Sequence, residues 1–142
     1  MPLDVWKFVH NIVRWRRRSP VLTCASGQPT THPALADVEY EELGAFSIER
    51  VFVCRGGVNT VRLLQLTRRS LLEEGQMVGA NALVNESWSC DVFRRSKDVY
   101  EARIRYSASM AKAYKNSPSK PVAIKEAKGI PGMMTILEAS DI

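Results

Sequence analysis

The sequence has few of the residues that build metal centres or disulfide frameworks. It holds three cysteines and two histidines among 142 residues, and none of these side chains stands in a Cys-x-x-Cys or His-x-His spacing. Metal binding needs several such ligands converging on one point, so we expect no metal site and no cofactor. An odd number of widely spaced cysteines also argues against a secreted disulfide scaffold and favours a reducing, cytoplasmic compartment.

Long apolar runs are also missing. No stretch approaches the ~18 consecutive apolar residues that cross a bilayer. The apolar share of 45% and the charged share of 25% are those of an average globular protein, and a chain of this length can form one domain with its own core. The start of the chain lacks the unbroken apolar stretch of a secretory signal, although its arginines leave an organelle transit segment as an alternative.

An excess of one charge is confined to the N-terminus. The formal net charge is +5, and residues 1–18 supply +4 of it, from five cations minus one aspartate: Lys7, Arg14, Arg16, Arg17 and Arg18 against Asp4. Trp6, Val9 and Val13 recur at helical spacing, which predicts an amphipathic basic helix that Pro20 ends. The residues of this helix that are candidates for contact with a partner or a membrane are Trp6, Phe8, Arg14, Trp15, Arg16, Arg17 and Arg18.

The predicted basic helix has three interpretations. Cations in its last turn complement the helix dipole by about 0.3–1 kcal/mol each, which suits a structural role against the sheet or a second copy. The same residues suit an anionic membrane surface, or the groove of a partner protein. Nucleic-acid binding could also use Arg94, Arg95, Arg103 and Arg105, but it is disfavoured because the charges outside the helix nearly cancel.

The chain divides into four segments. Residues 1–18 are the basic helix, 19–44 a linker rich in Pro, Ser and Thr with an acidic patch, 45–115 the core, and 116–142 an extension interrupted by Pro and Gly. Within the linker only residues 21–24 have the pattern of a strand. The extension could add an edge strand or embrace a neighbouring subunit. The acidic patch, which could lie against the basic helix, consists of Asp37, Glu39, Glu41 and Glu42.

The core segment predicts the order strand, helix, strand, strand. Residues 46–54 are partly apolar on both faces, and Asn59 can cap a helix over 61–78 that Gly79 ends in the left-handed conformation. Residues 82–92 and 100–110 alternate apolar and polar side chains and are joined by a short polar turn, which predicts an antiparallel hairpin. We therefore expect an α+β fold: a β-α-β-β core with an antiparallel sheet and one packed helix, preceded by the amphipathic basic helix.

Two details of this pattern assign side chains to faces. The apolar stripe of the helix is expected to contain Val61, Leu64, Leu71 and Val78. One face of the first hairpin strand is expected to carry Ala82, Val84, Trp88, Cys90 and Val92.

The segment GANALV, residues 79–84, leads from the predicted helix into the hairpin. In this motif and in the order of its elements, the stretch 45–112 resembles the bacterial YbjQ-like family of heavy-metal-binding domains. The resemblance implies a compact α+β domain that assembles into rings. The metal role proposed for that family finds no matching ligand spacing in this chain.

One turn is a candidate anion site. Backbone N–H groups at a helix N-terminus can hold an anion, and the predicted strand and helix are joined by a glycine pair with an arginine on each side. The candidate residues are Arg55, Gly56, Gly57, Asn59 and Arg62. Their spacing fits neither the Walker loop nor the dinucleotide fingerprint, so a tight structural turn is the competing explanation.

The cysteines have a structural interpretation. Cys54 and Cys90 fall on apolar faces of strands that could be neighbours, where cysteines act as small hydrophobic residues. Cys24 and His32 form a possible nucleophile and base, but no orienting carboxylate stands nearby in the sequence. We therefore name no catalytic residue.

These observations favour a binding protein over an enzyme. We expect a small, non-enzymatic, oligomeric binding or scaffold protein that contacts an acidic partner through the basic helix and exposed arginines. One alternative is a peripheral membrane-surface protein anchored by the N-terminal helix. The other is an enzyme that binds a phosphate ligand at the Gly56–Asn59 turn.

Overall fold

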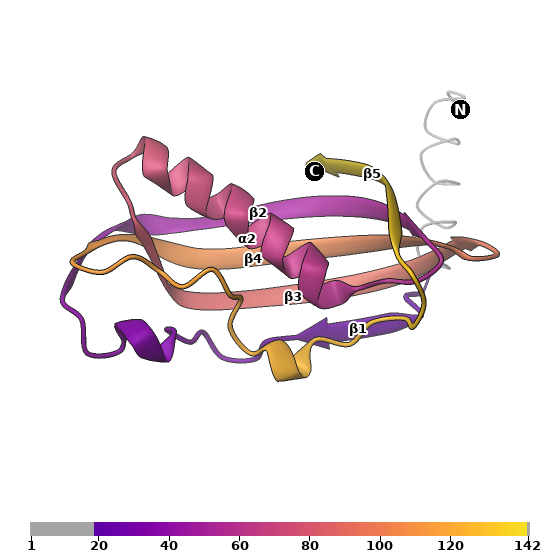
Figure 1. The fold of residues 1–142 in the computed structure, drawn as a ribbon, viewed down its shortest axis with the longest axis horizontal. Coiled ribbons are helices and arrows are strands. Elements are labelled where there is room, and N and C mark those ends of the chain that lie inside the picture. Colours follow the sequence, from indigo (N-terminus) through magenta and orange to yellow (C-terminus); the bar gives the residue numbers. More distant parts are fainter. Residues whose placement is uncertain (1–18, 142) are drawn as a thin grey trace, which may run out of the picture.

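The computed structural model describes residues 19–141, which form an α+β structure with one α-helix lying across a five-stranded antiparallel sheet (Figure 1). The predicted helix over residues 1–18 lies outside this range. In chain order the elements are β1 (Leu22–Ala25), the short helix η1 (Pro33–Leu35), β2 (Tyr40–Arg55), α2 (Thr60–Met77), β3 (Ala82–Ser96), β4 (Val99–Ala113), the short helix η2 (Ile124–Glu126) and β5 (Thr135–Asp141).

The predicted order of strand, helix, strand, strand is confirmed by β2, α2, β3 and β4. The strands lie in the order β1-β3-β4-β2-β5, so β4 is central and pairs with both β2 and β3. The strand expected near residues 21–24 is β1, which forms one edge of the sheet. The C-terminal extension supplies β5, which forms the other edge.

The core fills the space between α2 and the sheet. Leu63, Leu64 and Leu71 of the helix are fully buried, against sheet residues that include Phe52 and Ile104. Asn59 caps the helix, because its side-chain oxygen accepts the N–H of Arg62 at 3.1 Å. The expected cap at the other end is also present, since Gly79 has a φ of 92°.

The buried stripe of α2 differs from the predicted one. Val78 is 57% exposed and Val61 is only half-buried, so neither belongs to the core. The buried residues of α2 are Thr60, Leu63, Leu64, Thr67, Arg68, Leu71 and Gly75. A Cβ at Gly75 would lie 3.1 Å from the sulfur of Met110, so a glycine lets the end of α2 approach β4 closely.

A bulge in β3 changes which side chains share a face. Asn85 has a φ of 50°, and the pairing with β4 shifts between Val84 and Ser87. As a result, Val84 lies with Ala82 on the side covered by Leu35 of η1, whereas Trp88 faces α2. The prediction that these residues share one face was therefore wrong, because period-two counting takes no account of an inserted residue.

The segment between β4 and β5 runs over the same side of the sheet as α2. The Trp88 indole N–H donates to the Val122 carbonyl at 2.8 Å, and Val58 and Ile130 exchange two backbone hydrogen bonds of 2.9 Å. From there β5 pairs with residues 50–55 of β2. Within the described residues, the stretch 40–49 of β2 has a neighbouring strand on one side only.

Replacing Leu64 with Ala should lower the free energy of unfolding by about 2–5 kcal/mol, because it leaves a cavity between α2 and the sheet. The control variant Val78→Ala, at the exposed C-cap of the same helix, should change it by less than about 0.5 kcal/mol. Urea unfolding followed by circular dichroism measures both. Equal losses in the two variants would contradict the placement of α2.

Candidate functional site

The five candidate anion-binding residues lie in the turn between β2 and α2 and at the adjoining ends of these two elements. Gly56 has a φ of 89°, which favours glycine, and its N–H donates to the Asp98 carbonyl at 3.0 Å. The N–H of Val58 donates to Ile130, and that of Asn59 to the sulfur of Met134 at 3.2 Å. Several backbone donors of the turn are therefore used within the chain.

A groove of about 310 Å³ lies beside this turn, where residues 127–132 face the start of α2. The carbonyl of Lys128 accepts the hydroxyl of Thr60 at 2.6 Å, which holds the two walls together. A Cβ at Gly57 would lie 2.7 Å from the Gly132 carbonyl oxygen, so the close approach requires glycine. Arg55 and Arg62 are both exposed at this end of the sheet. The turn thus combines two cations with a tightly packed backbone.

The cysteines are arranged differently from the prediction. Strand β4 lies between β2 and β3, so Cys54 and Cys90 are not on neighbouring strands. Cys54 is paired with Tyr100, whereas Cys90 lies directly opposite Cys24 of β1. The Nδ1 of His32 accepts the N–H of Ala34 at 3.3 Å, so this side chain caps η1.

A buried polar network was not predicted from the sequence. Arg68 of α2 and Glu86 of β3 form an ion pair with an N–O distance of 2.6 Å, and their side chains are 2% and 0% exposed. The Tyr106 hydroxyl donates to the same carboxylate at 2.7 Å, and Arg68 also donates to the Pro118 carbonyl at 2.8 Å. One signal was available, since Glu86 occupies a position that the alternation assigned to the apolar face.

The partners of this network explain the direction of two pKa shifts. Burial raises the pKa of Tyr106, and the negative charge of Glu86 raises it further. Burial alone would lower the pKa of Arg68, but its hydrogen bond and ion pair with Glu86 outweigh that effect and raise the pKa. The arginine therefore stays charged and the tyrosine stays neutral, which suits a structural network.

The face of the sheet opposite α2 carries charges of both signs. Arg103 donates to Glu101 at 2.9 Å, and Arg105 donates to Glu49 at 2.7 Å. A hollow of about 330 Å³ on this face is lined by Glu49, Ser89, Asp91, Arg103, Ile104 and Arg105. Near the hairpin end Arg95 also contacts Glu101, at 3.2 Å, while Arg94 lies over the Tyr100 ring. These arginines are thus matched by groups of the chain itself.

No group of three or more His, Cys, Asp or Glu side chains within residues 19–141 could hold a metal ion. In the same range, no helix has the length and hydrophobicity needed to cross a membrane. The candidate contact residues Trp6, Phe8 and Arg14 to Arg18 lie outside the residues that the structure describes.

Comparisons of the chain with protein families, with curated proteins and with solved structures find no match. The resemblance to the YbjQ-like family therefore stays a prediction.

Replacing Glu86 with Gln should lower the free energy of unfolding by about 3–5 kcal/mol, because Arg68 then keeps a buried charge without its counterion. The control Glu49→Gln removes the partner of exposed Arg105 and should cost about 0–1 kcal/mol. Denaturant titration compares the two.

A double variant, Arg68→Met with Glu86→Leu, should lose less stability than Glu86→Gln, since no unpaired charge remains. Equal effects of Glu86→Gln and Glu49→Gln would contradict this account of the buried pair.

Proposed function

We propose that this chain is a non-enzymatic, oligomeric binding or scaffold protein whose N-terminal cations contact an acidic partner. The observation that carries the proposal is the uneven distribution of charge. Residues 1–18 have a net charge of +4 out of +5, which leaves +1 for the rest of the chain. Within that rest, Arg103 and Arg105 already interact with carboxylates of the same sheet face. The net positive charge of the chain is therefore concentrated before residue 19.

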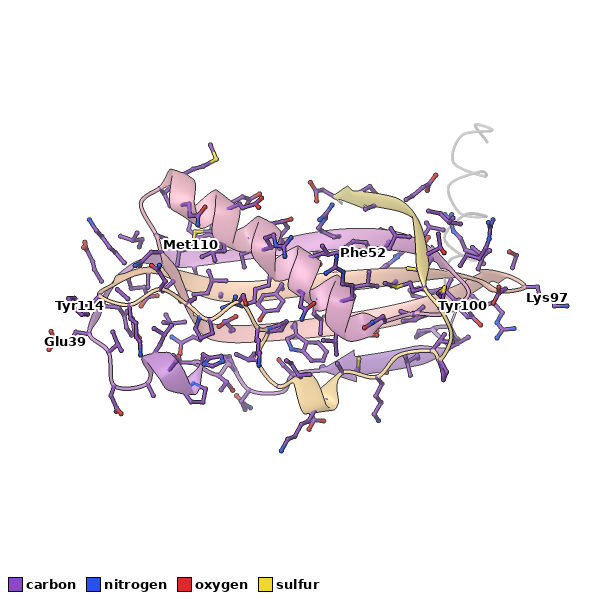
Figure 2. All side chains as sticks on the ribbon, in the orientation of Figure 1. Glu39, Phe52, Lys97, Tyr100, Met110 and Tyr114 are labelled. Atoms are coloured by element: carbon purple, nitrogen blue, oxygen red, sulfur yellow. The ribbon has the colours of Figure 1, made fainter. Side chains whose placement is uncertain are left out.

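The place where the N-terminal segment joins the sheet supports an external partner. The N–H of Val21 donates to the carbonyl of Val92 at 2.7 Å, which is near the β3–β4 turn. The acidic patch begins at the opposite end, where Tyr40 pairs with Ala113. Figure 2 shows Glu39 and Lys97 at these two ends. Val92 lies ten residues along β3 from Ala82, which is at the end of the sheet near the acidic patch. At ~3.3 Å per residue these two ends are about 33 Å apart, so the chain's own acidic patch is remote from Ser19.

Two features support an oligomeric form. The sheet face opposite α2 leaves Ser89, Asp91 and Arg105 exposed, and a face of mixed charge can be matched by a second copy of itself. The resemblance of residues 45–112 to the YbjQ-like family implies a ring. The molecular mass in solution tests this part of the proposal, and a monomer at all concentrations would contradict it.

The triple substitution R16Q/R17Q/R18Q should weaken binding of the full chain to polyglutamate by about tenfold or more, because an ion pair in water contributes on the order of 0.5 kcal/mol. The control R55Q/R62Q/R69Q removes the same charge from exposed positions at β2 and α2 and should weaken binding much less. Fluorescence anisotropy of labelled polyglutamate at constant ionic strength measures both affinities.

Other outcomes point to the alternatives. Equal losses in the two triple variants would refute a specific role of residues 1–18. Binding to phosphatidylserine vesicles without binding to polyglutamate would favour the membrane-surface protein. Thermal stabilisation by phosphate that is lost only in R55Q/R62Q/R69Q would favour the phosphate-binding enzyme.

A further inference from the structure

Two cysteines far apart in the chain face each other at the edge of the sheet. Cys24 of β1 and Cys90 of β3 are direct partners in the antiparallel register, and both are free thiols. Directly opposed residues have Cα atoms about 4.5–5.5 Å apart, which lies within the range of about 4.4–6.8 Å that a disulfide spans. Side chains of opposed residues project from the same face of the sheet, so the two sulfur atoms need little movement to join.

The two thiols have unequal surroundings. Cys24 lies on the edge strand and is partly exposed, and its sulfur accepts the backbone N–H of Lys128 at 3.4 Å. A hydrogen bond from the Cys90 thiol is the largest effect on the pKa of Cys24, and Lys128 adds to it. Together they outweigh burial and the charge of Asp91 and lower this pKa to about 6. Near neutral pH the Cys24 sulfur is therefore largely thiolate, the nucleophilic form.

Cys90 has the complementary character. It is buried, 1% exposed, and the neighbouring Cys24 and then burial raise its pKa. It stays protonated and donates its S–H to Cys24. This arrangement is that of an attacking thiolate beside a resolving thiol.

We propose that Cys24 and Cys90 form a reversible intramolecular disulfide when the protein meets hydrogen peroxide, which makes the β1–β3 edge a redox-modification site. The Cys24 thiolate attacks one oxygen of the peroxide, the O–O bond breaks, and hydroxide leaves, which gives a sulfenic acid. The Cys90 sulfur then attacks the Cys24 sulfur, the S–O bond breaks, and the thiol proton leaves with the hydroxyl group as water. Both sulfur atoms are oxidised, and the peroxide is reduced.

The disulfide has a consequence beyond the cross-link. The carbonyl of Lys128 accepts the hydroxyl of Thr60, and the N–H of the same residue contacts the Cys24 sulfur. Drawing that sulfur into a bond with Cys90 weakens its contact with Lys128, so oxidation acts directly on the segment that forms one wall of the groove at the start of α2.

The test treats the reduced full-length protein with hydrogen peroxide near neutral pH, alkylates the remaining thiols and measures the intact mass. We expect the loss of two hydrogens, one alkylated cysteine, a linked pair of peptides containing Cys24 and Cys90, and full reversal by dithiothreitol. Alkylation of all three cysteines after peroxide treatment would overturn the proposal. So would a link that includes Cys54 or that joins two chains.

Variants separate the roles of the three thiols. C54S is the matched control, because Cys54 is buried and that burial raises its pKa to about 11. The C54S variant should cross-link like the wild type. C24S should not cross-link, and C90S should stop at a sulfenic acid on Cys24 that dimedone traps.

The wild-type reaction rate should rise with pH through about 6 and then level off, since the thiolate fraction sets the rate. Cross-linking that persists in C24S would overturn the assignment, as would a rate that levels off only near the ordinary thiol pKa. If C90S does not fold, the wild-type peptide map and C24S still decide.

Discussion

The buried pair of Arg68 and Glu86 determines how α2 lies on the sheet. An uncompensated charge at either position would be strongly unfavourable, so the helix can slide or rotate only as far as the 2.6 Å contact allows. The same carboxylate accepts the Tyr106 hydroxyl of β4, and the same guanidinium reaches the carbonyl of Pro118. Four parts of the chain are therefore aligned by one charge pair, and the bulge at Asn85 is what turns Glu86 toward the helix.

The segment after β4 completes the layer that α2 begins. Its Val122 carbonyl accepts the Trp88 indole N–H, its Ile130 pairs with Val58, and its glycines permit backbone contacts that a side chain would block. The turn before α2 therefore packs against protein on a side that the sequence pattern left open to a ligand. This packing also puts the Lys128 backbone beside Cys24, so the character of the edge thiol depends on a segment more than 100 residues away.

Local patterns were sufficient for the framework and insufficient for its details. Period-two alternation in residues 100–110 and the cap at Asn59 predicted β4 and α2, because each pattern is produced by neighbours in the chain. The bulge at Asn85 lets Glu86 lie under the helix and contact Arg68. A short stretch of sequence does not contain both partners of this contact. The contact of Cys24 with Cys90 likewise depends on where an edge strand pairs. Residues 1–18 carry most of the net charge and hold the candidate partner-binding residues. For this segment the sequence is the only source of predictions.

Strand β2 extends beyond its outer neighbour, since β5 ends opposite Arg50 and residues 40–49 have no pairing strand on that side within the described chain. Exposed strand edges invite other chains to add to a sheet. Here Glu41 and Glu42 precede a shift in register at Gly44, whose φ is 132°. Repulsion between like charges and a break in the regular donor spacing both oppose strand addition. This stretch thus protects the molecule from growing into an extended intermolecular sheet while leaving its long strands intact.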